Sequence, residues 1–355
     1  MTNTARLVLE DGAVFHGRPF GFPAAVAGEV VFNTGMVGYP EALTDPSYRG
    51  QVLVLTYPLV GNYGVPARGG DDGLESPFES ESIQVSGLVV AETTTPSHRS
   101  AVKSLGEWLQ EHGVPGLSGV DTRALTKRLR QRGVMLGKLV SGDEDLEFRD
   151  PNRENLVAQV SVKEPVAYGS GPARVVLVDC GCKTSIVRSL VSRGLTVLRV
   201  PWDHDFLDDD FQGVVISNGP GDPKMCGPTI EHVRRAMERD VPILGICLGH
   251  QLLALAAGAD TYKLPFGHRS QNQPCLRPGT PRCYITSQNH GYAVDERTLP
   301  EDWMAWFRNL NDGTNEGIRH RTRPFASVQF HPEAAPGPLD TTFLFDDFVQ
   351  EIHGR

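Results

Sequence analysis

The sequence has no apolar run that approaches the roughly 20 residues needed for a membrane-spanning helix. Its first residues lead directly into a strand pattern, with neither the apolar centre of a secretory signal nor the Arg- and Ser-rich character of a transit peptide. These absences predict a cytoplasmic protein without a membrane segment. Basic runs are also scarce, since the densest is the short stretch 127–132, and the net charge of −9 argues against a nucleic-acid partner.

Cysteine is sparse, and its spacing is not that of a metal site. All six cysteines lie in the second half of the chain, and the closest pair, Cys180 and Cys182, does not have the spacing of zinc ligands. A chain of 355 residues without a secretion signal also gives little reason to expect disulfides. A glycine-rich phosphate loop with its lysine is missing as well. We therefore predict five reduced, structural cysteines, one reactive cysteine, and neither a metal nor a cofactor bound by this chain.

The composition changes along the chain in a way that predicts two domains. Residues 1–150 contain short β-like runs punctuated by Gly and Pro, together with two helix patterns, which predicts a β-rich α+β domain. Residues 151–172 predict a linker, which ends in the Gly- and Pro-rich stretch 169–172. Residues 173–355 alternate apolar strand runs with helix patterns, which is typical of an α/β domain whose mostly parallel sheet is flanked by helices.

The stretch Gly-Ile-Cys-Leu-Gly-His-Gln at 245–251 is the most informative in the chain. It follows the apolar strand run 241–244 and precedes the helix pattern 251–257. A Gly-x-Cys-x-Gly turn between a strand and a helix is typical of a nucleophile elbow, which holds one reactive side chain at the N-terminus of the helix. Small residues are needed on both sides because the backbone turns tightly. The predicted nucleophile is Cys247.

A histidine and a glutamate follow another strand run and predict the partner of this thiol. His331 and Glu333 come after the run 326–328, and in an extended segment residues two apart point to the same side. The carboxylate would fix the imidazole tautomer, and the imidazole would take the proton of the Cys247 thiol. Such a pair can attack an amide carbonyl, release ammonia and hydrolyse the resulting thioester without a metal.

A Gly- and Pro-rich turn supplies a candidate oxyanion site. The turn at 217–223 follows a third strand run and contains Gly219 and Gly221, whose backbone amides could face a ligand. The amide of Leu248, the residue after the nucleophile, would be the second donor. We expect these elements to meet because ligands of parallel α/β sheets bind at the carboxyl ends of the strands.

Taken together, the elbow, the Gly-Pro-Gly-Asp-Pro turn and the His-Pro-Glu motif resemble the class I, triad-type glutamine amidotransferases. More narrowly, nearly the whole chain is similar to the glutaminase subunit or domain of carbamoyl-phosphate synthetase, and the first half carries this narrower likeness. The further matching stretches are 7–12, 29–36, 38–41, 43–48, 56–58, 61–62, 119–123, 288–292, 311–313 and 315–317.

The resemblance implies roles for individual residues. It makes Cys247 the nucleophile, His331 the base and Glu333 the residue that orients the base. It also implies glutamine contacts, four of them through backbone groups, at Ser47, Gly219, Gly221, Leu248, Gln251, Asn289, Gly291 and Tyr292.

The resemblance also implies a partner. In this family the ammonia travels through an internal tunnel to a synthetase, either a large subunit or a fused domain. ATP, Mg²⁺ and bicarbonate are expected on that partner, and L-glutamine on this chain. Pyrimidine and arginine synthesis both fit the sequence, as do a separate subunit and an excised domain of a multifunctional protein.

Two alternative functions stay open at this point. One is another cysteine-dependent amidohydrolase; an α/β-hydrolase order of nucleophile, acid and histidine is disfavoured because His331 precedes Glu333. The other is a catalytically weak regulatory or scaffold subunit of the synthetase. The intact triad argues against it, but an intact triad does not measure turnover.

Overall fold

A computed structural model describes residues 4–70, 74–142 and 145–354 of the chain. The chain divides into two units, Met1–Glu154 and Asn155–Arg355. The boundary therefore lies inside the predicted linker, and residues 155–172 belong to the second unit. There β10 (Val166–Tyr168) forms an edge strand antiparallel to β12 (Leu195–Pro201), so this short segment has its own ladder of hydrogen bonds.

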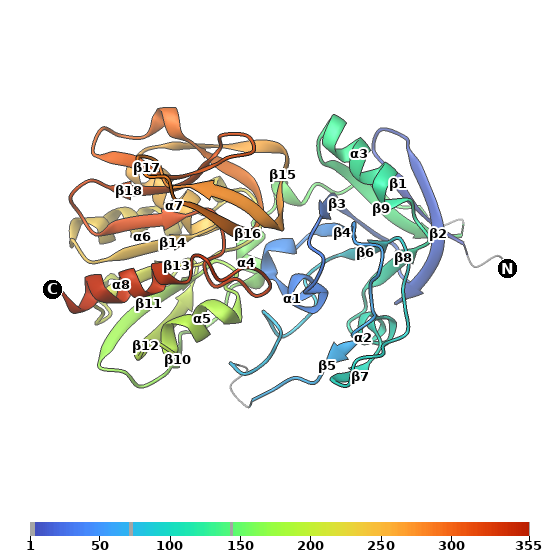
Figure 1. The fold of residues 1–355 in the computed structure, drawn as a ribbon, viewed down its shortest axis with the longest axis horizontal. Coiled ribbons are helices and arrows are strands. Elements are labelled where there is room, and N and C mark those ends of the chain that lie inside the picture. Colours follow the sequence, from blue (N-terminus) through green and yellow to red (C-terminus); the bar gives the residue numbers. More distant parts are fainter. Residues whose placement is uncertain (1–3, 71–73, 143–144, 355) are drawn as a thin grey trace. The chain divides into compact units, whose positions relative to one another are not determined.

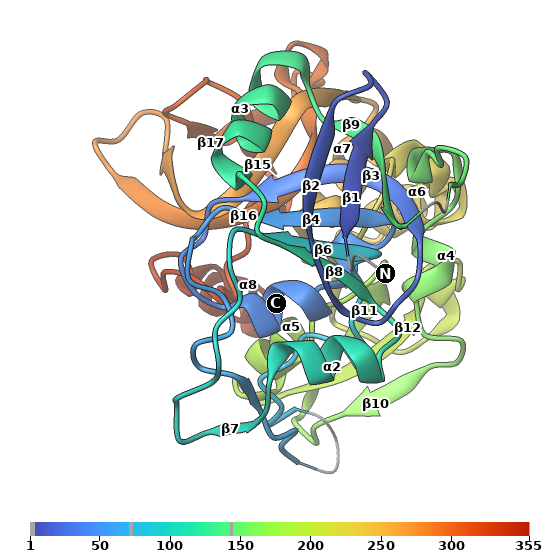
Figure 2. The same ribbon diagram turned by 90° about the vertical axis from the view of Figure 1, so that its right-hand side faces the viewer.

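The first unit is built on a closed barrel (Figure 2). Its strands, in barrel order, are β1 (Ala5–Leu9), β2 (Val14–Gly21), β8 (Pro115–Ser118), β6 (Gly87–Val90), β4 (Gln51–Leu55), β3 (Val26–Asn33) and β9 (Met135–Ser141). Closure leaves the barrel without an unpaired edge. The remaining elements of this unit are α1 (Tyr39–Thr44), α2 (Leu105–Glu111), α3 (Thr122–Arg132), the strand pair β5 (Val65–Pro66) and β7 (Ala101–Lys103), and the 3₁₀ turns η1 (Pro46–Tyr48) and η2 (Pro151–Arg153).

Local sequence explains where the elements of the first unit begin. The turn between β1 and β2 contains Gly12 at φ +84°, a conformation that glycine adopts without strain. Helix α2 begins at a capping box, in which the Ser104 side chain accepts from the Glu107 N–H and the Glu107 carboxylate accepts from the Ser104 N–H. The cap therefore separates β7 from the helix.

The second unit contains a ten-stranded mixed sheet in the order β10-β12-β11-β13-β14-β19-β18-β17-β15-β16. Five neighbouring strands are parallel, namely β12, β11 (Ala173–Asp179), β13 (Gly213–Ile216), β14 (Ile243–Ile246) and β19 (Phe325–Val328). The rest are antiparallel: β10, β15 (Asp260–Leu276), β16 (Cys283–Asp295), β17 (Trp303–Asn309) and β18 (Asn315–His320). The predicted α/β class is confirmed, but the sheet is not mostly parallel, because strands β10 and β15–β18 pair antiparallel.

Helices cover both faces of the parallel strands (Figure 1). Alternate residues of β11, Val176 and Val178, share one core with α6 (Gly227–Glu238) and α7 (Leu248–Ala257), so the intervening residues face the other side. That other side carries α8 (Phe343–His353), whose Phe348 and Ile352 lie close to Gly213 of β13. Burial on both faces explains the continuous apolar runs of these strands. The second unit also contains α4 (Val157–Val160), α5 (Thr184–Val191) and the 3₁₀ turns η3 (Phe206–Asp208), η4 (Pro223–Met225) and η5 (Glu296–Thr298).

Among the described residues, no helix combines the length and the apolar character that crossing a membrane requires.

Candidate active site

Cys247 lies in a tight turn between strand β14 and helix α7. Its φ of +55° is rare for a residue with a side chain, and the turn holds it there because the Cys247 N–H donates to the Val328 carbonyl at 2.8 Å. A Cβ on Gly249 would lie 2.1 Å from the Ile216 carbonyl oxygen, and a Cβ on Gly245 would lie 2.5 Å from the Gly249 carbonyl oxygen. The small residues are thus required by contact between backbones, as the elbow pattern predicts.

Strand register brings His331 to the same sheet edge. Strands β14 and β19 pair in parallel with Ile246 opposite Val328, so the residues that follow each strand leave the sheet side by side. His331 Nδ1 lies 2.6 Å from Glu333 Oε1, and both side chains are buried. This contact fixes the proton on Nδ1 and leaves Nε2 available for the thiol of Cys247.

The electrostatics of the pair favour a protonated imidazole. Burial alone would lower the pKa of His331, but the Glu333 carboxylate and the Cys247 sulfur raise it to about 10. Burial would likewise raise the pKa of Glu333, but Lys183 and His331 lower it to about 2. A proton transferred from the thiol is therefore stabilised on His331.

Lys183 is a member of the site that the sequence analysis missed. Its Nζ lies 3.0 Å from Glu333 Oε1 and 2.9 Å from the Ala334 carbonyl oxygen, with only 4% of the side chain exposed. Lys183 immediately precedes α5, at the carboxyl end of strand β11. A lysine at the edge where parallel strands end was the available signal, because that edge carries the predicted site.

The Gly- and Pro-rich turn lies against the elbow. A Cβ on Gly219 would come within 2.0 Å of the Cys180 carbonyl oxygen and 2.9 Å of a Leu248 side-chain carbon, so only glycine fits between them. Gly221 has a φ of +86°, which also favours glycine. Leu248 is the first residue of α7, where backbone N–H groups have no acceptor within the helix. The structure therefore places the two predicted oxyanion elements next to each other.

Gln251 and a residue that the sequence analysis missed, Gln329, form a buried chain to the nucleophile. The Gln251 Nε2 group donates to the Tyr292 carbonyl oxygen and to Gln329 Oε1, each at 3.0 Å. Gln329 consequently presents its own Nε2 group to Cys247 Sγ at 3.7 Å. Because the protein occupies both hydrogens of its Nε2 group, Gln251 has only Oε1 left for a ligand.

Strand β16 supplies the other predicted glutamine contacts of this unit. Asn289, Gly291 and Tyr292 follow one another there, and the Asn289 carbonyl oxygen lies 3.6 Å from Cys247 Sγ, which donates to it. His290 sits between them; burial and the nearby His268 hold the pKa of His290 well below its ordinary value, so its ring is neutral. The structure thus brings this strand to the nucleophile.

Ser47 belongs to the first unit. It lies in η1, is buried, and its N–H donates to the Asp45 carboxylate at 2.9 Å. Its predicted contact with glutamine stays a prediction.

Comparison with known proteins supports the narrower resemblance. Residues 176–351 match the family described as Glutamine amidotransferase class-I, and residues 7–139 match Carbamoyl-phosphate synthase small chain, CPSase domain. The chain is 52% identical over 363 residues to the arginine-specific carbamoyl phosphate synthase small chain of Aspergillus niger, covering 99% of this chain and 80% of that one.

Multifunctional proteins are also similar. Multifunctional protein CAD of Squalus acanthias is 53% identical over 354 residues, and Multifunctional protein pyr-3 of Neurospora crassa is 51% identical over 384 residues. Each alignment covers 98% of this chain, but the chain spans only 16% and 21% of those two proteins. With the small-chain matches, these likenesses establish that the chain belongs to the carbamoyl-phosphate synthase small chain family and carries a class I glutamine amidotransferase domain.

Proposed function

We propose that this chain hydrolyses L-glutamine to glutamate and ammonia through a thioester on Cys247. The observation that carries the proposal is the continuous set of contacts from Lys183 through Glu333 to His331, beside a thiol held in an elbow. Glu333 thus lies between two positively charged partners, Lys183 and the protonated His331 ring. The remaining ring nitrogen, His331 Nε2, faces the sulfur of Cys247.

The first half of the reaction forms the thioester. The sulfur of Cys247 attacks the side-chain amide carbon of glutamine, and the thiol proton passes to Nε2 of His331. The developing oxyanion would be stabilised by the backbone N–H groups of Gly219 and Leu248, at about 3 kcal/mol per donor. His331 then protonates the amide nitrogen, the C–N bond breaks, and ammonia leaves.

The second half regenerates the thiol. A water molecule gives one proton to His331 and attacks the thioester carbon, the C–S bond breaks, and glutamate leaves. His331 returns its proton to the sulfur of Cys247. Because Glu333 stabilises the imidazolium form, His331 can hold the proton after it leaves the water molecule and before it returns to the sulfur. This chemistry needs neither a metal nor a cofactor, so we propose none for hydrolysis by this chain.

The ammonia would pass to a carbamoyl-phosphate synthetase, as a large subunit or as a fused domain. Two observations support this partner: residues 7–139 match the small-chain domain, and the relatives are synthase small chains and much longer multifunctional proteins. ATP, Mg²⁺ and bicarbonate would bind on that partner, since the sequence has no phosphate loop. The product would serve arginine or pyrimidine synthesis.

Ammonia release from glutamine tests the proposal directly. The wild-type chain, Cys247→Ser and the matched control Cys283→Ser would be assayed with and without the synthetase partner; Cys283 is exposed. We expect Cys247→Ser to lose activity and Cys283→Ser to keep it. Denaturing mass spectrometry of quenched wild-type protein should find a glutamyl group on Cys247. Ammonia release by Cys247→Ser would show that the nucleophile is misassigned, and a wild-type complex that releases none would favour a scaffold subunit.

The role of Ser47 needs its own test. We propose that it helps to bind glutamine, so Ser47→Ala should raise KM for glutamine while kcat changes little. An unchanged KM would remove Ser47 from the binding site and leave the hydrolytic proposal intact.

A further inference from the structure

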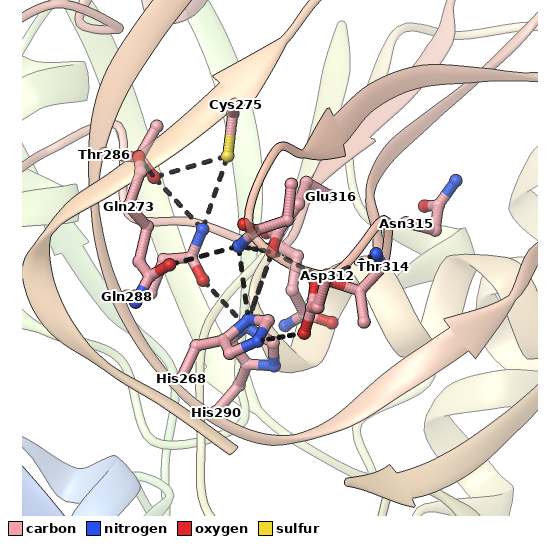
Figure 3. Close-up of polar contacts among 12 residues, drawn as sticks. His268, Gln273, Cys275, Thr286, Gln288, His290, Asp312, Thr314, Asn315 and Glu316 are labelled. Carbon is pink, nitrogen blue, oxygen red and sulfur yellow. Dashed lines mark hydrogen bonds and ion pairs between the residues drawn. The ribbon is translucent and has the colours of Figure 1, made fainter.

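A second cluster of chemically capable side chains lies in the antiparallel half of the second unit (Figure 3). His268 of β15, His290 of β16 and Glu316 of β18 are 7%, 4% and 0% exposed, and one potential ligand atom of each lies within 4.8 Å of the others. The proposed hydrolysis uses none of them. Three strands therefore converge on a buried set of two imidazoles and a carboxylate.

The outward-facing nitrogen of each imidazole is already held. His268 Nε2 lies 2.8 Å from Asp312 Oδ2, and His290 Nδ1 lies 2.8 Å from the Tyr292 carbonyl oxygen. The other nitrogens face Glu316, with His268 Nδ1 at 3.3 Å and His290 Nε2 at 4.0 Å from its Oε1. Imidazoles that bind metals are held in this way, with a carboxylate or a backbone carbonyl on the far nitrogen.

Both ring nitrogens of His290 face hydrogen-bond acceptors. Nδ1 lies 2.8 Å from the Tyr292 carbonyl oxygen, and Nε2 lies 3.1 Å from Gln288 Oε1. The Gln288 amide is oriented by its other end, because its Nε2 donates to Thr286 Oγ1, whose own proton goes to the Gln273 carbonyl oxygen. With a proton between Nδ1 and the Tyr292 carbonyl, His290 Nε2 and Gln288 Oε1 can share either a second proton or a cation.

Glu316 is similarly short of partners. Its Oε1 accepts from the Asn309 side chain at 3.0 Å, while its buried Oε2 has no hydrogen-bond partner among the described residues. A buried carboxylate oxygen without a donor is costly. Glu316 thus keeps lone pairs that no donor among the described residues uses.

A proton alone accounts for only part of this arrangement. His268 lies between two carboxylates, with its Nδ1 3.3 Å from Glu316 Oε1 and its Nε2 2.8 Å from Asp312 Oδ2. A protonated His268 ring would donate one N–H to Glu316 Oε1 and the other to Asp312 Oδ2. It leaves Glu316 Oε2 without a hydrogen-bond partner among the described residues. A cation bound by His268 Nδ1, His290 Nε2 and Glu316 Oε1 would neutralise this carboxylate directly.

We propose that His268, His290 and Glu316, with Gln288 Oε1 as a fourth donor, bind one divalent transition-metal ion, with Zn²⁺ the best match. Two imidazoles with oxygen donors suit Zn²⁺, whereas Mg²⁺ and Ca²⁺ favour oxygen donors alone. Tetrahedral Zn²⁺ bonds of about 2.0–2.1 Å place neighbouring ligand atoms about 3.3 Å apart, which is the present distance between His268 Nδ1 and Glu316 Oε1.

The site is structural in character. Protein atoms supply all four donors and the cluster is buried, so no coordination position is open to a substrate. The ion would tie β15, β16 and β18 together at His290, within the run of residues from Asn289 to Tyr292. Binding would displace the Nδ1 proton of His268, while Asp312 would remain hydrogen-bonded to the bound imidazole.

Metal content and spectroscopy test the proposal without reference to activity. Chelator-treated chain would be titrated with Zn²⁺ and Co²⁺, and the bound metal counted after gel filtration. We expect one ion per chain and, for Co²⁺, visible d–d bands without a thiolate charge-transfer band. Glu316→Gln should lose the ion, and Asp312→Asn should weaken it about 10–100-fold. The matched control His353→Asn removes an exposed histidine of α8 and should bind normally.

Two results would overturn the proposal. One is wild-type protein that retains no more metal than Glu316→Gln or that binds none after chelator treatment. The other is binding that disappears in Cys247→Ser, because the ion would then occupy the thiol–imidazole pair. Should Glu316→Gln fold poorly, Asp312→Asn decides the question, since the Asp312 side chain is 42% exposed and the change is isosteric. Unchanged affinity in that variant refutes the role of Asp312 and of the cluster.

Discussion

Replacing Lys183 with methionine should destabilise the second unit because it leaves the Glu333 carboxylate buried beside a single partner. Burial raises the pKa of Glu333, but the positive charges of Lys183 and, to a smaller extent, His331 lower it from 4.5 to about 2. At about 1.4 kcal/mol per pKa unit, that shift corresponds to about 3 kcal/mol of stability. Removing one partner of a buried ion pair costs about 3–5 kcal/mol, which agrees in size. We therefore expect Lys183→Met to lower the free energy of unfolding by at least about 3 kcal/mol at pH 7.

The loss of stability in Lys183→Met should depend on pH. Because the pKa of Glu333 is depressed in the fold, its contribution to stability is present above about pH 4.5 and is lost as the pH falls toward about 2. The variant lacks the main cause of that depression. The difference in stability between wild type and Lys183→Met should accordingly be full at neutral pH and shrink as the pH falls below about 4.5.

Urea unfolding followed by tryptophan fluorescence provides the assay. A Trp108→Phe background in every protein confines the signal to Trp202, Trp303 and Trp306, which all lie in the second unit. Lys224→Met is the matched control, because Lys224 pairs with Asp260 in the same unit but both side chains are more than half exposed. Exposed pairs contribute about 0–1 kcal/mol. The reasoning fails if Lys183→Met costs no more than this control, or if its cost does not change with pH.

Two further predictions concern the elbow and the imidazole. Gly249→Ala should yield little folded protein, because its Cβ would meet the Ile216 carbonyl oxygen at 2.1 Å, whereas Gly227→Ala in α6 has open space and should fold normally; soluble yield and circular dichroism compare them. In Glu333→Gln, the main cause that raises the pKa of His331 to about 10 is lost. The raised pKa contributes stability that is present below about pH 6.5 and lost as the pH rises through about 10, so the difference in urea midpoint from wild type should shrink toward pH 10; a constant difference would contradict it.

Local patterns in the sequence were sufficient to predict the elbow at Cys247 and the contact between His331 and Glu333. The Gly-x-Cys-x-Gly turn is recognisable from its own small residues, and the shared direction of His331 and Glu333 follows from the period of an extended chain. Both constraints are visible in a short window of sequence. The parallel half of the sheet was predictable for the same reason, since its strands are continuous apolar runs.

The features that were missed depend on contacts between distant segments. Lys183 meets Glu333 across 150 residues, and Gln329 meets Gln251 across 78. No local pattern marks a buried lysine or glutamine whose partner lies on another strand. The edge strand β10 lies within the predicted linker, because only three of its residues pair and a Gly-rich stretch follows them. Long-range pairing decides such segments, and composition does not record it.

The backbone of Cys247 has a consequence for how this protein can change over evolutionary time. Holding a residue with a side chain at φ +55° costs about 1–3 kcal/mol. Glycine would adopt the same conformation without that cost, although it loses more conformational freedom on folding. The backbone conformation at this position therefore does not favour cysteine over glycine. A lineage that acquired another source of ammonia could lose the thiol and keep the architecture intact.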